Sequence, residues 1–462
     1  MKNSYFVIVT GILILLAACN QKSIVLFNGV NAGQWKLVGE ATVSDGMLSI
    51  KGAEAQAVLK EGNYRHFELD LELRTTQGGK GSIWFHAGES GAKGYRIAVN
   101  NDRYDPVWWK MTGSLISVRN LTKSFVKEDE WFQMKIRVFG QAVTVSINGE
   151  PVVEYIQPEN PYRINPNAEA LLSEGLFVLD SYGAGEIQFK HIQLQILDAP
   201  EPDEIQTQLA AAMNEQNDDI IKLHQENFPV LDYHVHLKGG LTKESAAKQS
   251  RNWGINYVLA PNCGIGFPIT NDREVTDYLD SMRTQPFILA MQAEGREWIE
   301  TFSRQVRDEF DFVFTDALTF TDAKGRRTRL WIPEETWIED EQQYMDLIVD
   351  RICDVLQEPM DVYVNPCFLP SPMDERYDEF WTEARMNKFI AALAKSGKAL
   401  EINARYKIPN RAIIQKAKDA GVKLTFGTNN GGNDLGKLEY CIEMKKACNI
   451  TAENMYKPSI KI

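Results

Sequence analysis

Two histidines, His234 and His236, are separated by a single residue near the middle of the chain. The apolar residues Val230 and Leu231 precede them, followed by Asp232, and this pattern predicts a buried strand. Alternate side chains of a strand share a face, so both imidazoles and the Asp232 carboxylate point the same way. Two imidazoles at the end of a strand can begin a metal site, or they can simply be polar residues that close the strand.

Polar residues also end each of the later strands that we expect in the second half of the chain. Apolar segments there alternate with helical segments, which predicts an α/β fold with seven β/α units. In a (β/α) barrel the reactive groups lie at the C-terminal ends of the strands. The residues at the expected ends after the histidine pair are Asn262, Glu294, Asp316, Asn365, Glu401, Asn403 and Asn429. An open doubly wound sheet is the alternative, and the lack of a Gly-rich phosphate turn favours the barrel.

The acidic residues and the histidines together predict metal-assisted acid–base chemistry. Imidazole and carboxylate are common metal ligands, so we expect one divalent ion, with the candidate ligands His234, His236, Glu294 and Asp316. A bound ion can activate water for hydrolysis. Glu294 or Asp316 would be the general base if it is not a ligand, and Glu401 is a further catalytic candidate.

The remaining polar residues suit a substrate with hydroxyl and anionic groups. Amides can hydrogen-bond hydroxyls, as a sugar-like substrate requires, and the candidates are Asn262, Asn365, Asn403 and Asn429. Lys238 lies two residues after His236, and Arg296 lies two residues after Glu294, so both are placed to bind an anion. Any single one of these residues could instead be a helix cap or a loop residue.

Three segments of this half resemble one known family. Asp232-Tyr233-His234-Val235-His236 is similar to the opening motif of the polymerase and histidinol phosphatase (PHP) family, and Leu400-Glu401-Ile402-Asn403 to its late Glu-x-Asn strand. The block Gly427-Thr428-Asn429-Asn430-Gly431 matches its last motif in position. The resemblance implies a seven-stranded metallohydrolase barrel that cleaves phosphoesters. No histidine follows His236, so we expect one ion in place of the family's cluster of metals.

The first half of the chain has a different pattern. Phe67 to Leu73 and Val143 to Ile147 alternate apolar and polar residues, as half-buried strands do. Turns are expected at pairs such as Asn28-Gly29 and Asn148-Gly149. Short strands at regular spacing, without helical periodicity, predict an all-β sandwich or jelly roll.

An ordered series of short motifs in this half resembles the 3-keto-disaccharide hydrolase domain. The motifs are Leu26-Phe27-Asn28-Gly29, Trp35, Asp45-Gly46, Phe67-Glu68-Leu69, Gly94-Tyr95, Trp131 and Asn148-Gly149. The resemblance implies a concanavalin-like jelly roll that binds or acts on sugars. The family's Tyr-Glu-x-Gln is replaced here by Tyr95-Arg96-Ile97-Ala98, which favours sugar binding over catalysis in this domain.

Four residues of this half are expected to contact a sugar. Trp108 and Trp109 can stack on the apolar face of a pyranose, and His86 and Arg96 can hydrogen-bond hydroxyls. Core packing is the alternative for the tryptophans. Because neighbouring residues of a strand face opposite ways, one of Trp108 and Trp109 is expected to be exposed or in a loop.

The N-terminus is predicted to be a processing signal. Lys2 precedes the apolar run from Phe6 to Leu16, which is short for a membrane span. Leu16-Ala17-Ala18-Cys19 resembles the lipobox of bacterial lipoproteins, which implies a signal peptide at residues 1–19 and acylation of Cys19. Asn20, in place of an inner-membrane retention aspartate, suggests the outer membrane.

Composition and boundaries complete the expected organisation. The Pro-rich acidic stretch near residue 198 separates a jelly roll at 24–197 from a linker and connecting helix at 198–226 and a PHP-like barrel at 227–462. The net charge of −13 argues against a nucleic-acid partner, and the six cysteines include no CxxC pair. We therefore expect a lipid-anchored carbohydrate-processing hydrolase whose jelly roll binds sugar and whose barrel performs metal-assisted hydrolysis. The alternatives are a non-catalytic glycan-binding lipoprotein and a 3-keto-glycoside hydrolase or lyase that acts through the jelly roll.

Overall fold

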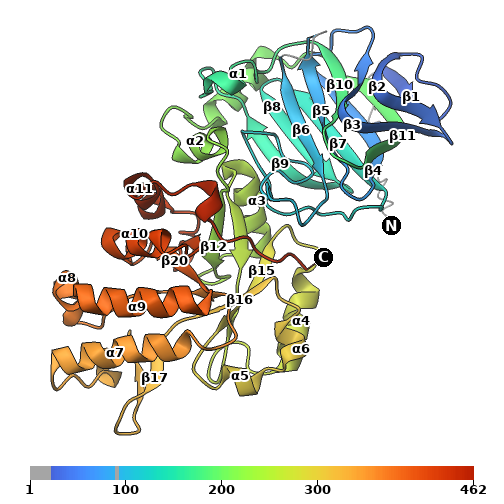
Figure 1. Cartoon of the computed structure of the whole chain (residues 1–462). Coiled ribbons are helices and arrows are strands. Elements are labelled where there is room, and N and C mark those ends of the chain that lie inside the picture. Colours follow the sequence, from blue (N-terminus) through green and yellow to red (C-terminus); the bar gives the residue numbers. More distant parts are fainter. Residues whose placement is uncertain (1–21, 89–92, 462) are drawn as a thin grey trace, which may run out of the picture.

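The computed structural model describes residues 22–88 and 93–461. It contains an antiparallel β-sandwich followed by a parallel sheet surrounded by helices (Figure 1). The expected signal peptide and Cys19 lie outside the described residues. Within them, no helix combines the length and the apolar character that crossing a bilayer requires.

The sandwich is built from eleven antiparallel strands whose side chains alternate between core and surface. In β4, for example, Phe67, Leu69, Leu71 and Leu73 are buried and the residues between them are half-buried. The strand order is β6-β5-β10-β3-β11-β4-β7-β8-β9, with β1 beside β11 and β2 beside β3. The strands are β1 (Ser23–Phe27), β2 (Trp35–Ser44), β3 (Met47–Leu59), β4 (Phe67–Thr75), β5 (Lys80–Ala87), β6 (Tyr95–Asn100), β7 (Phe132–Phe139), β8 (Ala142–Ile147), β9 (Glu150–Ile156), β10 (Leu176–Ser181) and β11 (Glu186–Ile196). This confirms the expected antiparallel sandwich.

Two short helices, α1 (Pro202–Ala211) and α2 (Asp219–Gln225), replace the single connecting helix expected from periodicity. The break contains Glu215, whose carboxylate accepts hydrogen bonds from the Tyr155 hydroxyl at 2.7 Å and from Arg163 Nη1 at 2.8 Å. Asp218 then caps α2 by accepting from the Ile220 N–H. A buried ion pair with the sandwich has therefore overridden the local helical pattern.

The second part is a parallel sheet that nearly closes into a barrel. Its strand order is β12-β13-β15-β16-β19-β20-β21, with β14 beside β15. The Asn429 N–H, just after the last strand, donates to the His234 carbonyl of the first strand at 2.8 Å, which brings the two ends of the sheet together. The strands are β12 (Leu231–Val235), β13 (Asn256–Leu259), β14 (Asn262–Cys263), β15 (Ile288–Ala293), β16 (Phe312–Thr315), β19 (Val362–Tyr363), β20 (Ala399–Asn403) and β21 (Leu424–Gly427).

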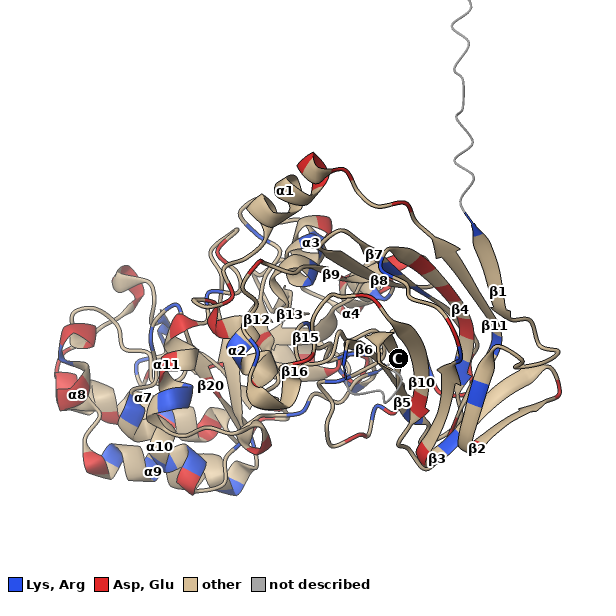
Figure 2. Ribbon diagram, turned by 90° about the horizontal axis from the view of Figure 1, so that it is seen from above, with Lys and Arg blue, Asp and Glu red and all other residues tan. Residues whose placement is uncertain are grey.

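Helices follow the strands and cover the outside of this sheet, with mixed charges on their outer surfaces (Figure 2). Several begin at a side chain that accepts a hydrogen bond from the helix backbone: Thr242, Asn271, Asp340, Thr382 and Asn410. The helices are α3 (Lys243–Trp253), α4 (Asp272–Met282), α5 (Trp298–Thr301), α6 (Arg304–Arg307), α7 (Glu341–Val355), α8 (Tyr377–Phe380), α9 (Glu383–Ser396), α10 (Arg411–Asp419) and α11 (Glu439–Ala447). A hairpin of β17 (Thr319–Thr321) and β18 (Arg327–Arg329) is inserted after β16.

The two parts pack tightly against each other. Trp108 and Trp109 of the sandwich belong to the apolar core of the barrel, whereas Ile221 of α2 belongs to the core of the sandwich. Polar contacts accompany this packing: Lys123 Nζ donates to the Phe287 carbonyl at 2.9 Å, and Arg119 Nη2 donates to the Asn252 carbonyl at 3.1 Å. The chain therefore folds as two cores that exchange side chains.

Candidate active site at the end of the barrel strands

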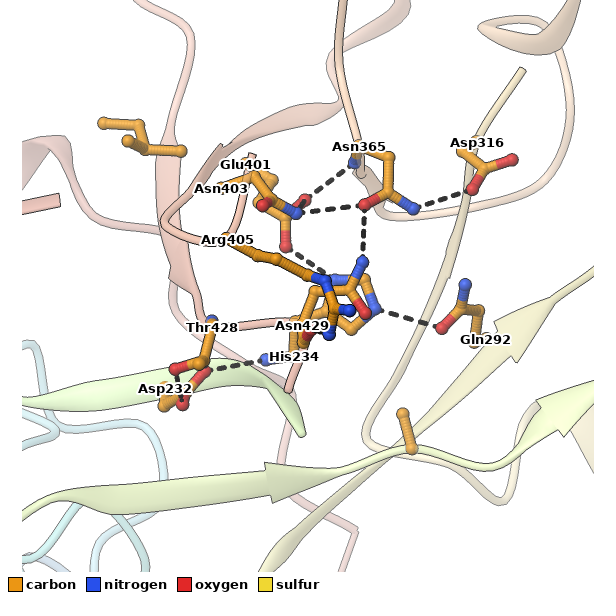
Figure 3. A network of polar contacts seen from close by, with 12 residues as sticks. Asp232, His234, Gln292, Asp316, Asn365, Glu401, Asn403, Arg405, Thr428 and Asn429 are labelled. Carbon is orange, nitrogen blue, oxygen red and sulfur yellow. Dashed lines mark hydrogen bonds and ion pairs between the residues drawn. The ribbon is translucent and has the colours of Figure 1, made fainter. Parts of the chain in front are cut away.

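Most of the polar residues predicted at the strand ends belong to one hydrogen-bonded network, and Figure 3 shows the part of it around His234, Glu401 and Asn365. His234 lies on β12, and Glu401 and Asn403 lie on β20. Asp316, Asn365 and Asn429 directly follow β16, β19 and β21 or lie within two residues of them. Because parallel strands end at the same edge of the sheet, side chains distant in sequence meet here.

The centre of the network is a buried pair formed by His234 and Glu401. The distance from His234 Nδ1 to Glu401 Oε1 is 2.6 Å, and His234 Nε2 lies 3.0 Å from Gln292 Oε1. The second oxygen of Glu401 accepts from the Asn365 N–H at 2.7 Å and from Asn403 Nδ2 at 3.1 Å. Both ring nitrogens and both carboxylate oxygens therefore already have protein partners.

Glu294 has a different environment, because only one of its oxygens is engaged. Oε1 accepts from Asn262 Nδ2 at 2.6 Å and from Gln292 Nε2 at 2.9 Å, whereas Oε2 has no hydrogen-bond partner among the described residues. The side chain is only 6% exposed. Burial, reinforced by the nearby charge of Asp316, raises the pKa of Glu294 to about 8. This carboxyl can exchange a proton through its free oxygen.

Asp316 is also buried, but its oxygens are occupied. Oδ2 accepts from Asn365 Nδ2 at 2.8 Å, and Oδ1 accepts from the Leu318 N–H at 3.0 Å. Burial raises the pKa of Asp316, and the hydrogen bond from Asn365 opposes that rise. Asp316 therefore acts on Glu294 through its charge, and neither of its oxygens is free to contact a substrate.

The asparagines divide into two groups. Asn365 Oδ1 accepts from Asn403 Nδ2 at 3.0 Å and from Asn429 Nδ2 at 2.9 Å, so Asn365 and Asn403 are held inside the network and are buried. Asn262 and Asn429 are only partly buried. Asn262 and Asn429 are thus the amides that a substrate can reach.

His236 and Asp232 support the strand end from either side of His234. His236 Nδ1 lies 2.7 Å from the Ala260 carbonyl, and burial keeps the pKa of His236 well below its usual range. Asp232 accepts from the Thr428 N–H at 2.9 Å, from the Thr428 hydroxyl and from the Gly436 N–H at 3.1 Å. Asp232 therefore ties β12 to the segment after β21.

The side chains expected to bind a metal do not fit a four-ligand site as they lie. Both nitrogens of His234 and both oxygens of Asp316 are committed to protein partners, which leaves His236 Nε2 and Glu294 Oε2 without partners among the described residues. Across residues 22–88 and 93–461, no group of three or more His, Cys, Asp or Glu side chains is arranged to hold an ion. A metal would require His234 to give up one of its hydrogen bonds.

The two cations predicted to bind an anion differ in their surroundings. Arg296 Nη1 pairs with Glu358 at 2.9 Å, and its Nη2 donates to the Thr315 hydroxyl and the Asp316 carbonyl. Lys238 is exposed and forms no ion pair within 4.0 Å among the described residues. Arg296 therefore holds the end of β16, and Lys238 remains available.

Three of the sugar-contact residues predicted in the sandwich are buried, which corrects that expectation. Trp108 and Trp109 lie in a loop but are each 6% exposed, because they fill the contact with the barrel, where Trp109 Nε1 donates to Asn227 Oδ1. His86 is 1% exposed, accepts from the Ser173 N–H and donates to the Arg65 carbonyl. Burial lowers the pKa of His86 to about 4. None of these side chains offers a surface to a sugar.

Arg96 lies on an open face of the sandwich. Its guanidinium lies 4.9 Å above the ring of Trp84, and Trp84 Nε1 donates to Asp180 Oδ2 at 2.7 Å. The three side chains come from the neighbouring strands β6, β5 and β10 and are all partly exposed, and Tyr182 beside them is 53% exposed. An aromatic ring beside fixed polar groups is the usual composition of a sugar-binding surface.

Several residues of the barrel network were not found from the sequence. Gln292 connects His234 to Glu294, and the side chain of Asn430 accepts from the His236 N–H at 2.7 Å. Arg405 reaches from the end of β20 to the Asn429 carbonyl at 3.2 Å. Gln292 could have been predicted from the sequence, because it lies two residues before Glu294 and so faces the same side of the strand.

The comparison with known families identifies the first part of the chain. Residues 22–195 match the family described as the 3-keto-alpha-glucoside-1,2-lyase-like domain. The sandwich is a 3-keto-disaccharide hydrolase-like jelly roll. The match agrees with the expected fold and with the resemblance carried by the motifs from Leu26 to Gly149, and it does not extend to the barrel. No curated protein matches the chain.

Several solved structures align with this part of the chain at low identity and with low TM-scores. A candidate glycosyl hydrolase from Parabacteroides distasonis is 19% identical, with a TM-score of 0.34, over 38% of this chain and 94% of that one. The carbohydrate-binding module CBM66 from Bacillus subtilis is 12% identical, with a TM-score of 0.27, over 35% and 95%. A protein with a galectin-like fold from Bacillus subtilis is 14% identical, with a TM-score of 0.27, over 39% and 100%.

Proposed function

We propose that this protein is a carbohydrate-processing hydrolase in which the jelly roll binds sugar and the barrel carries out acid–base hydrolysis. The observation that carries the proposal is Glu294, a buried carboxyl with one oxygen fixed by two amides and the other free. General acids and bases in enzymes are typically held in this way, with one proton-exchanging atom facing the substrate.

The network gives each residue a role in this reaction. Protonated Glu294 gives its proton to the leaving oxygen as the scissile bond breaks. Water forms the new bond to the released glycosyl or phosphoryl centre and returns a proton to Glu294, which Gln292 holds in position. The His234–Glu401 pair fixes Gln292 from behind, since His234 Nε2 contacts Gln292 Oε1. Asn262 and Asn429 hydrogen-bond substrate hydroxyls. Phosphoester cleavage, which the PHP resemblance implies, is one form of this hydrolysis.

The jelly roll supplies binding through the face that carries Trp84, Arg96 and Asp180. The family that it matches is described by a reaction of an α-glucoside, which supports a sugar as its ligand. Trp84 can stack on a pyranose ring, while Arg96 and Asp180 hydrogen-bond hydroxyls.

A second candidate function is glycan binding without catalysis. The observation that favours it is the saturation of the barrel network, in which His234, Glu401 and Asp316 have no free ring nitrogen or carboxylate oxygen. In this case Glu294 would have only a structural role. The wild-type protein would show no turnover, so substitution of Glu294 could not reduce it.

Turnover by a Glu294→Gln variant of the full chain separates the two functions. Wild-type protein is assayed against nitrophenyl glycosides and sugar phosphates, and the variant is expected to lose about 100-fold or more of any activity found. Glu443→Gln, at an exposed position of α11, is the matched control and should keep that activity. Full activity in Glu294→Gln contradicts the proposal.

We also propose that the chain is held in a bacterial cell envelope, in the outer membrane, through acylated Cys19. The support is the sequence Leu16-Ala17-Ala18-Cys19 alone. Cells grown with labelled palmitate should label the wild-type chain, and Cys19→Ser should abolish the label. Equal labelling of both chains would contradict the anchor.

A further inference from the structure

We propose that the end of the barrel next to Glu294 binds an anionic group of the substrate, a carboxylate or a phosphate, between Lys238 and Arg405. The inference rests on the proposed hydrolytic site, because it names the class of substrate for that site. It adds Arg405, which no sequence motif indicated.

Arg405 is fixed over the site by the backbone that follows β21. It extends from the end of β20, and its Nη1 donates to the Asn429 carbonyl at 3.2 Å. Figure 3 shows the side chain running toward Asn429 and His234. The guanidinium also packs on Gly431, where an added side-chain carbon would lie 2.8 Å from Nη1. One face of the guanidinium is thereby held in place while the side chain stays exposed.

Lys238 approaches the same backbone from the loop after β12. The Lys238 N–H donates to the His236 carbonyl at 3.0 Å, which turns the chain immediately after the histidine. The next residue, Gly239, packs on Gly431 and Gly432. A carbon added at Gly239 would lie 2.9 Å from the Gly431 carbonyl oxygen and from Gly432 Cα. Gly239, the residue after Lys238, and the Arg405 guanidinium therefore both contact Gly431, and Arg405 lies close enough for its charge to act on Lys238.

Within the described part of the chain, neither of these two charges has an acidic side chain in direct contact. Among the described residues, neither forms an ion pair within 4.0 Å. The carboxylate nearby, Asp434, is used by the backbone, because its Oδ1 accepts from the Gly431 and Gly432 N–H groups at 2.7 and 2.8 Å. Burial and the charge of Arg405 both lower the pKa of Lys238, and the carboxylates of Asp434 and Glu294 oppose this shift without reversing it.

Three other basic residues of the barrel half do have acidic partners. Arg296 pairs with Glu358, Arg326 with Asp322 and Arg329 with Glu335. Lys238 differs from these three residues because it has no close acidic partner among the described residues, while its charge acts on the carboxyl of Glu294. A bound anion would relieve the repulsion between Lys238 and Arg405 and orient the substrate toward Glu294.

The class of ligand follows from this arrangement. Guanidinium and ammonium groups together bind a carboxylate or a phosphate, whereas neutral sugars are bound by amides and aromatic rings. Asn429, whose carbonyl accepts from Arg405, and Asn262, which contacts Glu294, are partly exposed and suit hydroxyl groups. An acidic sugar or a sugar phosphate presents both kinds of group at once.

Calorimetric titration of the full chain in the Glu294→Gln background tests the inference without turnover. The probes are glucuronate, glucose 6-phosphate and, as the neutral control, glucose. At least one charged probe should bind, and Lys238→Met and Arg405→Met should each weaken it about tenfold or more. Lys437→Met, an exposed lysine outside the pair, is the matched control and should leave the affinity unchanged.

Each result has a clear meaning. Binding of glucuronate alone identifies a carboxylate, and binding of glucose 6-phosphate alone identifies a phosphate. Failure of both charged probes at about 10 mM, or equal loss of glucose and charged probes in the variants, overturns the anion site. Persistent turnover in Glu294→Gln would instead overturn the hydrolytic role of Glu294 while leaving anion binding intact.

Discussion

The jelly roll and the barrel place their polar residues in opposite ways. In the jelly roll, Trp84, Arg96 and Asp180 lie on the open face of a sheet whose other side forms the core. In the barrel, His234 and Glu401 lie inside the protein and are satisfied by one another and by their neighbours. Polar residues on an open face can change with little effect on folding, whereas those inside the barrel contribute to stability and to chemistry together.

The largest expected effect comes from breaking the buried pair. Glu401→Ala leaves the His234 ring, the Asn365 N–H and the Asn403 amide without their acceptor, so it should lower the free energy of unfolding by about 3–5 kcal/mol. Glu68→Ala, which removes a partly exposed pair with Arg137 on the jelly roll, should cost about 0–1 kcal/mol. Urea unfolding measures both, and equal losses would refute the contrast.

Removing a tryptophan from the contact between the two parts should have the next largest effect. Trp109→Ala deletes a buried indole and its hydrogen bond to Asn227, so we expect a loss of about 3 kcal/mol. Trp253→Ala, at an exposed position of α3, is the matched control and should be nearly neutral. Thermal melting compares the two, and a neutral Trp109→Ala would show that this contact does not hold the parts together.

Acid should destabilise the protein through two neutral histidines, His86 in the jelly roll and His224 in α2. Burial lowers the pKa of His86 to about 4 and that of His224 to about 3, against about 6.5 in an unfolded chain. Between pH 6.5 and these values the two histidines are protonated in the unfolded chain but not in the folded protein. The free energy of unfolding therefore decreases as the pH falls. Each histidine can contribute up to about 1.4 kcal/mol per pH unit.

The measurement is the free energy of unfolding at several pH values below 6.5. His86→Gln should reduce its dependence on pH, because the ionisable ring is gone. Gln193→Ala, on the half-buried outer part of β11, changes no ionisable group and is the control. Identical slopes for wild type and His86→Gln would contradict this assignment.

The smallest expected effect is on sugar binding by the open face. Trp84→Ala should weaken binding of methyl α-glucoside about fivefold, since stacking on one ring is worth about 1 kcal/mol, and it should barely change the melting temperature. Nuclear magnetic resonance titration measures the affinity, with Trp253→Ala as the control. Unchanged affinity would show that this face does not bind sugar. A large loss of stability would show that polar residues on the open face contribute to folding as those inside the barrel do.

Much of the fold could be predicted because it follows from local patterns. The alternation from Phe67 to Leu73 and the polar ends of the parallel strands depend on neighbours in sequence, and the structure has both. The positions of Trp108, Trp109 and Glu215 could not be predicted, because they depend on how the two parts dock. The same holds for His234, whose residue type suggests a metal ligand but whose partners are set by strands that are distant in sequence.

The exchange of side chains between the two cores limits how this chain can be divided. Cutting at the acidic stretch near residue 198 would leave Trp108 and Trp109 of the jelly roll facing water and would remove Ile221 from its core. The barrel fragment would in turn lose two large rings from its interior. A jelly roll borrowed from another protein of its family could not simply replace this one, because it would have to bring tryptophans shaped for this particular barrel.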